Sequence, residues 1–153
     1  SLRIMKILMV CLGNICRSPI AQGILSSKTK HLNIIVDSAG TAGYHTGSPP
    51  DSRSIEIAKR HNIDLQNQRA RQFTRNDFDE FDIIYAMDTN NYAHLIALTK
   101  NQKEKEKIRM ILNEIEPGLF QSVPDPYYGG KNGFEKVYNL LEKACHKIAN
   151  QIE

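Results

Sequence analysis

The fold of this 153-residue chain is decided by one stretch, residues 5–19, which reads MKILMVCLGNICRSP. Residues 4–10 form a short apolar run with β-branched ends, which is typical of a buried strand. Gly13 and Asn14 then break that pattern, and Ser18-Pro19 is a helix-start signal, a capping hydroxyl followed by a proline in the first turn. The stretch therefore predicts a strand, a short loop and a helix that continues to about residue 29.

The rest of the chain alternates between strand and helix signals. Further buried strands are expected at residues 33–37, 82–87 and 107–112, and further helices at residues 51–62, 88–98 and 134–152. Loops are expected at the Gly- and Pro-rich residues 38–50 and 116–133, and a solvated loop and helix end at residues 100–109. Strands that alternate with helices pair in parallel through right-handed crossovers. The sequence therefore predicts one doubly wound α/β domain over residues 1–153, of which residues 1–4 are expected to include vector-derived residues before a native Met5.

Composition and charge exclude several classes of protein. Hydrophobic residues make up 41% of the chain and charged residues 24%, which is ordinary for a globular domain and unlike a disordered one. No apolar run approaches the roughly 18 residues of a membrane helix. The net charge of +3 is spread over a basic segment, residues 53–75, and an acidic one, residues 76–90, whereas a nucleic-acid binder shows a sustained basic face. No nucleic-acid or membrane partner is expected.

Cysteine and histidine usage bears on the compartment and on metal binding. Cys11, Cys16 and Cys145 cannot all pair within one chain, and no secretory signal precedes them, so we expect free thiols in a reducing cytoplasm. Cys145 falls on the apolar face of the last predicted helix and is expected in the core. The five histidines show no spacing suited to a metal, and Cys11 and Cys16 lack the second ligand pair of a zinc site. No metal or other cofactor is expected.

Residues 11–18 place reactive side chains at the favoured site of the predicted fold. Ligands of an open parallel sheet bind at the carboxyl ends of its strands, and a strand–loop–helix connection there points N–H groups and the helix dipole at one anion. The same surroundings stabilise a thiolate, so Cys11 can act as a nucleophile, with the guanidinium fork of Arg17 as an anion clamp. Ser18 can donate its hydroxyl to the sulfur, and Asn14 suits a left-handed backbone and can pin the loop with its amide. A lone cysteine after a strand is more often a buried apolar residue, but the conjunction of suited residue types favours the nucleophile.

The loop and several later motifs resemble those of the low molecular weight protein tyrosine phosphatases, over nearly the whole chain from about Met5. The matching motifs lie at residues 10–19 (VCLGNICRSP), 37–41 (DSAGT), 70–71 (AR), 77–78 (DF), 81–82 (FD), 86–88 (AMD), 91 (N) and 123–127 (VPDPY). The resemblance implies a three-layer domain with a four-stranded parallel sheet flanked by helices. It also implies hydrolysis of phosphotyrosine and small aryl phosphates through a cysteinyl phosphate, without a metal. In that reaction it implies Cys11 as the nucleophile, Arg17 as the phosphate clamp and Asp125 as the general acid.

Asp125 has the chemistry that this role needs. A phenolate leaving group benefits from a proton, and two flanking prolines fix the direction of the Asp125 carboxyl. A turn aspartate between prolines is the alternative from local sequence alone. Aromatic walls around a deep anion cradle favour a flat aryl phosphate, although a single tyrosine is more often ordinary surface. The residues expected to form the cradle and its walls are Leu12, Gly13, Asn14, Ile15, Cys16, Ser18, Tyr44, Tyr127 and Tyr128.

The resemblance further implies supporting and redox roles. Ser38 matches a hydroxyl that braces the Asn14 side chain, with a strand-end turn as the alternative. Gln68 stands where relatives often carry a histidine, so part of the support for the loop is expected to be open. Tyr44 stands where many relatives carry a tryptophan, a departure that bears on substrate preference. A reversible Cys11–Cys16 disulfide under peroxide would protect Cys11 from irreversible oxidation, and a buried thiol that backs the loop is the alternative for Cys16.

Two other functions fit the same loop. An arsenate reductase of this fold would add two cysteines after the third strand, but residues 83–120 contain none. A non-catalytic binder of phosphotyrosine or another oxyanion would need neither a nucleophile nor an acid. The sequence therefore favours a cytoplasmic, redox-regulated tyrosine phosphatase. It would act on a tyrosine-phosphorylated protein, release inorganic phosphate and be mostly monomeric, with weak self-association through exposed tyrosines.

Overall fold

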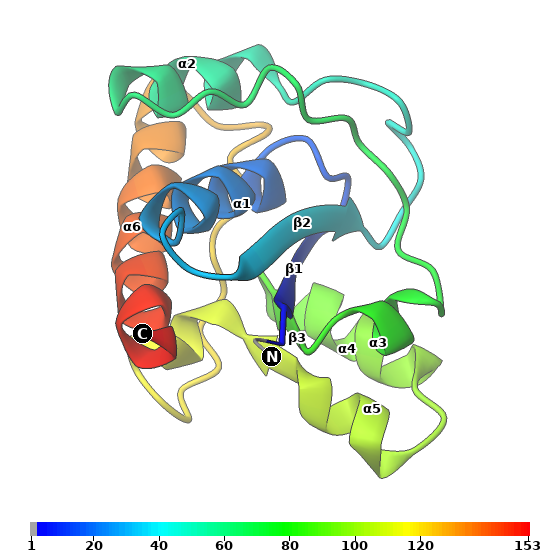
Figure 1. The fold of residues 1–153 in the computed structure, drawn as a ribbon. Coiled ribbons are helices and arrows are strands. Elements are labelled where there is room, and N and C mark those ends of the chain that lie inside the picture. Colours follow the sequence, from blue (N-terminus) through cyan, green and yellow to red (C-terminus); the bar gives the residue numbers. More distant parts are fainter. Residues whose placement is uncertain (1–2) are drawn as a thin grey trace.

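A four-stranded parallel sheet forms the centre of the molecule, in the strand order β2-β1-β3-β4 (Figure 1). The computed structural model describes residues 3–153. The strands are β1 (Met5–Cys11), β2 (Ile34–Gly40), β3 (Ile83–Ala86) and β4 (Ile108–Met110). The expected parallel α/β sheet is thus confirmed, with each strand close to its predicted place.

Helices cover both faces of this sheet, which makes three layers. On one side α1 and α6 pack together, and α2 packs against both of them (Figure 1). The other side carries α3 and α4, while α5 lies beside β4 at the edge. The bounds are α1 (Arg17–Lys28), α2 (Ser52–Arg60), α3 (Asp77–Glu80), α4 (Thr89–Leu98), α5 (Gln102–Lys107) and α6 (Lys131–Ile152), with a 3₁₀ turn at Ile111–Glu114. Within residues 3–153, no helix is long and apolar enough to cross a membrane.

Strand β1 is buried on both faces because both sets of its alternating side chains are apolar. Ile7 and Met9 enter the core on the α1 and α6 side, and Leu8 and Val10 enter the core under α3 and α4. A strand that is covered on both faces needs a continuous apolar run, and residues 7–10 supply one. The run that predicted this strand therefore also fixes its central place in the sheet.

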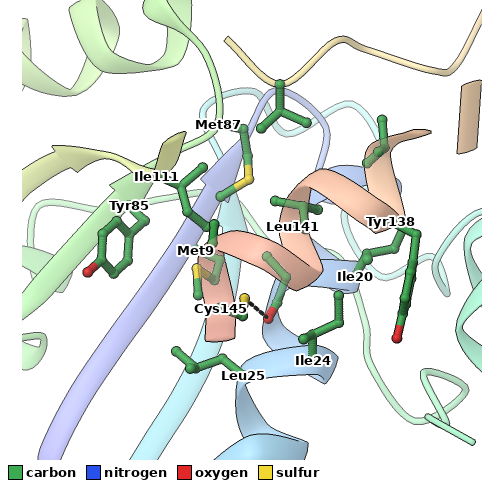
Figure 2. Close-up of a cluster of buried hydrophobic side chains, with 14 of the residues drawn as sticks. Met9, Ile20, Ile24, Leu25, Tyr85, Met87, Ile111, Tyr138, Leu141 and Cys145 are labelled. Carbon is green, nitrogen blue, oxygen red and sulfur yellow. Dashed lines mark hydrogen bonds between the residues drawn. The ribbon is translucent and has the colours of Figure 1, made fainter. Parts of the chain in front are cut away.

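The larger core lies between the sheet and helices α1 and α6, where Met9, Leu25, Tyr85 and Leu141 are all fully or almost fully buried (Figure 2). Cys145 lies in the same cluster, as predicted, and its Sγ is 3.7 Å from the carbonyl oxygen of Ala21 on α1. Burial of this kind removes several hundred square ångströms of apolar surface from water, at roughly 25 cal/mol per Å². The packing fixes α1 against the sheet and so fixes the loop that leads into α1.

The structure corrects two predicted boundaries beside this loop. Strand β2 was expected to end at residue 37, but it continues to Gly40 because residues 38–40 pair with residues 9–11 of β1. Only glycine fits at position 40, since a Cβ there would lie 2.6 Å from the carbonyl oxygen of Leu12. Helix α1 begins at Arg17, so Ser18 lies inside the first turn and is not the cap.

Short polar elements make up the remaining differences. Helices α3 and α5 were not predicted: they have 4 and 6 residues, and α5 buries none of its side chains, so it has no apolar periodicity. The side chain of Asn101 caps α5 by accepting from the backbone N–H of Glu104 at 2.8 Å. The strand expected at 107–112 is shorter and passes into the 3₁₀ turn, and α6 begins at Lys131 instead of residue 134.

The connections diverge at β1. The chain passes from β1 to β2 on one side of it, and then crosses to β3, which pairs with the other side. Crevices for ligands form at the carboxyl end of a strand where the connections diverge in this way. That position is held by Cys11, the last residue of β1.

Candidate active site

The loop between β1 and α1 is held by backbone hydrogen bonds to two later segments. The carbonyl oxygens of Cys11 and Leu12 accept from Thr41 and Ala42 at 2.9 Å each, and that of Ile15 accepts from Asp51 at 2.8 Å. At the helix end of the loop, no side chain caps α1. The first N–H groups of α1 therefore make no hydrogen bond to a capping side chain, and together with the helix dipole they favour the binding of an anion.

Cys11 lies at the centre of a small group of hydrogen-bond donors. Its side chain is buried, and its Sγ lies 3.0 Å from the hydroxyl oxygen of Ser18 and 3.3 Å from the backbone nitrogen of Asn14. The predicted contact between Ser18 and the sulfur is therefore confirmed, although its predicted role as the helix cap is wrong. Donors aimed at sulfur stabilise the thiolate over the thiol.

Asn14 connects the loop to three other parts of the chain. Its φ of 58° confirms the expected left-handed backbone. Its amide nitrogen donates to the hydroxyl oxygens of Ser18 at 2.8 Å and Ser38 at 2.9 Å, which confirms the expected contact with Ser38. Its amide oxygen accepts from the backbone N–H of Arg71 at 3.0 Å. The Ser38 hydroxyl in turn donates to Gln22 on α1 at 2.6 Å.

Arg17 is buried and held on one side by the protein itself. Its Nη1 donates to a carboxylate oxygen of Asp88 at 2.7 Å and to the carbonyl oxygen of Val123 at 3.0 Å. Sequence reasoning placed Asp88 at the start of a helix and missed it as a partner of Arg17. Asp88 also caps α4, by accepting from Asn91 N–H at 2.7 Å. The available signal was its position just after β3, the neighbour of β1 in the sheet.

Asp125 lies on a loop that is fastened to the end of β3. The N–H of Val123 donates to the carbonyl oxygen of Met87 at 2.8 Å, and one Asp125 carboxylate oxygen accepts from Tyr127 N–H at 3.0 Å. The other carboxylate oxygen lies 3.6 Å from Nη2 of Arg17, and 42% of the side chain is exposed. A half-exposed carboxyl beside the clamp can reach both solvent and a bound anion.

One cavity of about 320 Å³ brings the three predicted catalytic side chains together, Cys11, Arg17 and Asp125. The rest of its lining contains Leu12, Gly13, Ile15, Cys16, Tyr44, His45, Tyr127 and Tyr128. We call Tyr44, Tyr127 and Tyr128 the rim tyrosines. Asn14 and Ser18, predicted as substrate-binding, are buried and contact Cys11 from behind instead of lining the cavity.

His45 is a lining residue that sequence reasoning missed. Its ring centroid lies 6.4 Å from that of Tyr127, and its Cδ2 lies so near Gly13 that a Cβ there would be 3.0 Å from it. Its position next to Tyr44 in the loop of residues 41–51 was the only signal in the sequence. A histidine at the mouth adds a hydrogen-bonding group to an otherwise aromatic wall.

The side chain of Gln68 is only partly satisfied by hydrogen bonds. Gln68 donates from its amide nitrogen to the carbonyl oxygen of Pro19 at 3.1 Å, and its buried Oε1 has no hydrogen-bond partner within the described part of the chain. Gln68 thus supports the first turn of α1 through one hydrogen bond, and the opening in the support of the loop stays a prediction. Residues 3–153 contain no group of three or more His, Cys, Asp or Glu side chains arranged to hold a metal ion.

Cys16 and Cys145 are free, buried thiols in environments that disfavour ionisation. Burial, and then the negative charge of Asp51, raise the pKa of the Cys16 thiol to about 12. Burial also raises the pKa of Cys145, which is completely enclosed. Both side chains therefore stay protonated at neutral pH.

Comparison with known proteins agrees with this geometry. The model of the family described as low molecular weight phosphotyrosine protein phosphatase matches residues 6–153. The human low molecular weight phosphotyrosine protein phosphatase is 42% identical, over 92% of this chain and 90% of the human one. The chain belongs to this family and has the protein-tyrosine-phosphatase activity that defines it.

Solved structures show the same fold. The protein tyrosine phosphatase of Entamoeba histolytica, crystallised with Hepes in its active site, superposes with a TM-score of 0.90, at 39% identity and over 97% of this chain and 96% of that one. Vibrio vulnificus Wzb, in complex with benzylphosphonate, superposes with a TM-score of 0.87, at 30% identity and over 97% of this chain and 98% of that one. The four-stranded sheet and its flanking helices are therefore those of the family.

The raised thiol pKa values predict slow alkylation of two of the three cysteines. At about pH 8, iodoacetamide should modify Cys16 and Cys145 in the native protein on the order of 100-fold or more slowly than in urea, because only the thiolate reacts. Peptide mapping by mass spectrometry measures both sites in one sample. Modification of native Cys16 at the rate of the unfolded chain would show that its thiol is neither buried nor protonated.

Proposed function

We propose that the enzyme hydrolyses phosphotyrosine in two steps, with Cys11 as the nucleophile, Arg17 as the phosphate clamp and Asp125 as the general acid and then base. The observation that carries this proposal is that the three side chains line one cavity at the carboxyl end of β1. The sulfur of Cys11 also accepts from donors that favour its thiolate.

In the first step, the Cys11 thiolate attacks phosphorus and a P–S bond forms. The bond between phosphorus and the tyrosyl oxygen breaks, and Asp125 gives its proton to that oxygen, so tyrosine leaves as the neutral phenol. In the second step, the Asp125 carboxylate takes a proton from a water that attacks phosphorus. The P–S bond then breaks and inorganic phosphate leaves. The contact with Ser18 stabilises the thiolate that departs.

Arg17 suits the clamp because half of its guanidinium is already fixed. The bonds from Nη1 to Asp88 and Val123 set the plane of the group, and its other nitrogens share that plane. A planar fork binds two phosphate oxygens at once, which an ammonium group cannot do. The substrate oxygens therefore meet a donor whose direction is set beforehand.

We infer that the preferred substrates are aryl phosphates presented by a protein chain. The rim tyrosines and His45 form the wall of the cavity, and Tyr44 and Tyr128 are 77% and 94% exposed, so they extend well beyond Cys11. Hepes and benzylphosphonate, which occupy or complex the related proteins above, carry a tetrahedral sulfonate and an aryl-linked phosphonate. Both ligands agree with a tetrahedral anion site, and the second agrees with an aromatic neighbour.

We further propose a setting for this activity. The enzyme forms one domain over residues 1–153, works in the cytoplasm, where its three free cysteines would stay reduced, and is mostly monomeric with weak self-association through the rim tyrosines. It needs no cofactor for the two steps above. Neither nucleic acid nor a membrane is proposed as a partner.

We also propose that Cys16 protects Cys11 from irreversible oxidation. Peroxide converts the Cys11 thiolate to a sulfenic acid, and attack by the Cys16 sulfur forms the S–S bond and releases water. Support comes from their common loop and from the cavity that both residues line. The raised pKa of Cys16 slows this attack at neutral pH, because only the thiolate attacks.

Replacement of Cys16 tests this protection. After peroxide and then dithiothreitol, the parent should recover most of its own untreated rate, whereas Cys16→Ser should recover a much smaller fraction of its own untreated rate, because its sulfenic acid proceeds to sulfinic acid. The measurement is the rate with p-nitrophenyl phosphate before and after each treatment. Equal recovered fractions would remove Cys16 from the redox chemistry.

Replacement of the nucleophile tests the central proposal. In EDTA with p-nitrophenyl phosphate, Cys11→Ser should lose more than about 1,000-fold of kcat and still bind inorganic phosphate by calorimetry. Cys145→Ala removes a thiol that does not line the cavity, and it should keep the parent rate. Turnover that survives in Cys11→Ser would refute the covalent mechanism. A parent that reduces arsenate with a thiol donor but does not hydrolyse the ester would favour the reductase.

The general acid should matter most for poor leaving groups. Asp125→Ala should lower kcat about 100-fold for phenyl phosphate and much less for p-nitrophenyl phosphate, whose phenolate leaves without a proton. Asp79→Ala, which removes an exposed carboxyl on α3, is the matched control and should change neither rate. Equal losses of Asp125→Ala on both esters would exclude proton donation by this residue.

A further inference from the structure

The amide of Asn14 is oriented by a residue far along the chain. Asn14 is buried, and its own backbone N–H donates a hydrogen bond to the sulfur of Cys11. Its amide nitrogen faces two hydroxyls, while its amide oxygen accepts from the N–H of Arg71, 57 residues later. Because an N–H can only donate, Arg71 determines which end of the amide faces the hydroxyls.

The segment that carries this N–H is held by its backbone on the side of β2 and of the loop before α2. Gly40 donates to the carbonyl of Arg71 at 2.8 Å and accepts from Phe73 at 2.7 Å, and Ala70 exchanges hydrogen bonds of 2.8 Å with Gly47 and Ser48. Its pairing with the sheet is one isolated parallel bridge, between Gly40 and Gln72. These bonds leave the N–H of Arg71 to face Asn14, so the direction of this N–H also depends on what holds the Arg71 side chain.

The side chain of Arg71 supplies that constraint. Its two terminal nitrogens bind both carboxylate oxygens of Asp77 at 3.0 Å, and its Nε and Nη2 bind one oxygen of Asp37 at 3.3 and 3.1 Å. Asp77 is only 6% exposed and also accepts from the N–H of Thr74 at 2.8 Å. A bidentate pair with a buried carboxylate is directional and costly to break.

The two acids come from different elements. Asp37 lies on β2 next to Ser38, which accepts from the amide nitrogen of Asn14, and Asp77 begins α3. The guanidinium therefore joins β2 to α3, and the residue that carries it holds the other end of the Asn14 amide. None of these atoms lines the catalytic cavity.

We propose that Arg71 is a positioning residue for the phosphatase reaction. Its guanidinium is held between Asp37 and Asp77, so its backbone N–H keeps its hydrogen bond to the amide oxygen of Asn14. The oriented Asn14 in turn keeps the hydrogen bond from its own backbone N–H to the Cys11 sulfur. The inference rests on Cys11 as the nucleophile. Without the ion pairs to Asp37 and Asp77, Arg71 is held by its backbone alone, its hydrogen bond to the Asn14 amide weakens, and so does one donor to the thiolate. The effect falls on the reactivity of Cys11 and not on the binding of phosphate by Arg17.

Other titratable groups face Cys11 and must stay constant in a test. They are Arg17 and Cys16 from the loop and α1, His45 and Tyr44 from the loop before α2, and Asp125, Tyr127 and Tyr128 from the loop before α6. Asp88 acts on this group through Arg17. Variants at Arg71 replace none of these groups, so a change in Cys11 reactivity reports on the ion pairs of Arg71 with Asp37 and Asp77.

The test compares Arg71→Met with Arg75→Met. Arg75 is also partly buried, pairs with Glu104 at 3.0 Å and lies over the ring of Phe78, but it does not contact Asn14. For each variant we would measure the pH dependence of Cys11 alkylation by iodoacetate, kcat and KM for p-nitrophenyl phosphate, and Tm.

Arg71→Met should move the midpoint of Cys11 alkylation upward by about one pH unit and lower kcat about tenfold, with KM changed less than about threefold, because a hydrogen bond to a charged group is lost. Arg75→Met should lower Tm by a similar amount and leave both the midpoint and kcat in place. Arg71→Lys should lie between Arg71→Met and the parent, since it keeps the charge and loses the fork. Unchanged alkylation in Arg71→Met, or an equal change in Arg75→Met, would overturn the proposal.

A double-mutant cycle separates positioning from general loosening of the fold. In an Asn14→Ala background, Arg71→Met should add almost nothing to the loss of kcat, because the path through Asn14 is already broken. Additive losses would overturn the proposal. If Arg71→Met does not fold, Asp77→Asn replaces it in the cycle, since it weakens the same pair. The two proposals can fail separately. If Cys11→Ser loses turnover but the losses of Arg71→Met and Asn14→Ala are additive, the phosphatase mechanism stands and only the role of Arg71 is refuted.

Discussion

The left-handed backbone of Asn14 is the constraint on which the rest of the site depends. With φ at 58°, the residue turns its N–H toward the sulfur of Cys11 and its side chain away from the cavity, into the protein. A non-glycine residue in this region costs of order 1 kcal/mol or more and persists only when its surroundings hold it. Ser18, Ser38 and Arg71 do so, from α1, from β2 and from the segment after α2.

Structure and chemistry share the same residues at the carboxyl end of the sheet. Asp88 caps α4 and also pairs with the buried Arg17, while the carbonyl of Val123 accepts from the same guanidinium nitrogen. Breaking a buried ion pair by removing one partner costs on the order of 3–5 kcal/mol, because a charge is left uncompensated. The position of Arg17, the phosphate clamp, therefore depends on the same contacts that attach α4 and the Asp125 loop to the sheet.

Features that depend on local sequence were predictable, and those that depend on contacts between distant segments were not. The apolar run of β1, the start of a helix at residue 88 and the left-handed Asn14 each follow from a few neighbouring residues, and the structure has all three. The continuation of β2 to Gly40 depends on pairing with β1, so a Gly- and Ser-rich stretch that predicts a loop becomes a strand. Helix α5 has no apolar periodicity to detect.

The same division applies to the site. Nine consecutive residues, 11–19, were enough to predict an anion-binding loop with a cysteine nucleophile. The family resemblance added Asp125 and Ser38 from elsewhere in the chain. The pairing of Arg17 with Asp88, the bond from Arg71 to Asn14 and the bond from Arg71 to Asp37 join residues that are 71, 57 and 34 positions apart. The place of His45 in the cavity wall also depends on distant segments. Such contacts leave no periodic pattern or turn signal, because the folded chain alone brings the partners together.

The contact between Arg17 and Asp88 gives the phosphate-binding arginine a resident counter-ion. With Nη1 committed to the Asp88 carboxylate and to the carbonyl of Val123, the guanidinium is never a bare buried cation. Phosphate therefore binds to an arginine whose charge is already partly compensated, and the fold itself avoids much of the desolvation that an unpaired buried arginine would undergo. The same pairing weakens the attraction of the arginine for departing phosphate, which favours repeated turnover over storage of the anion.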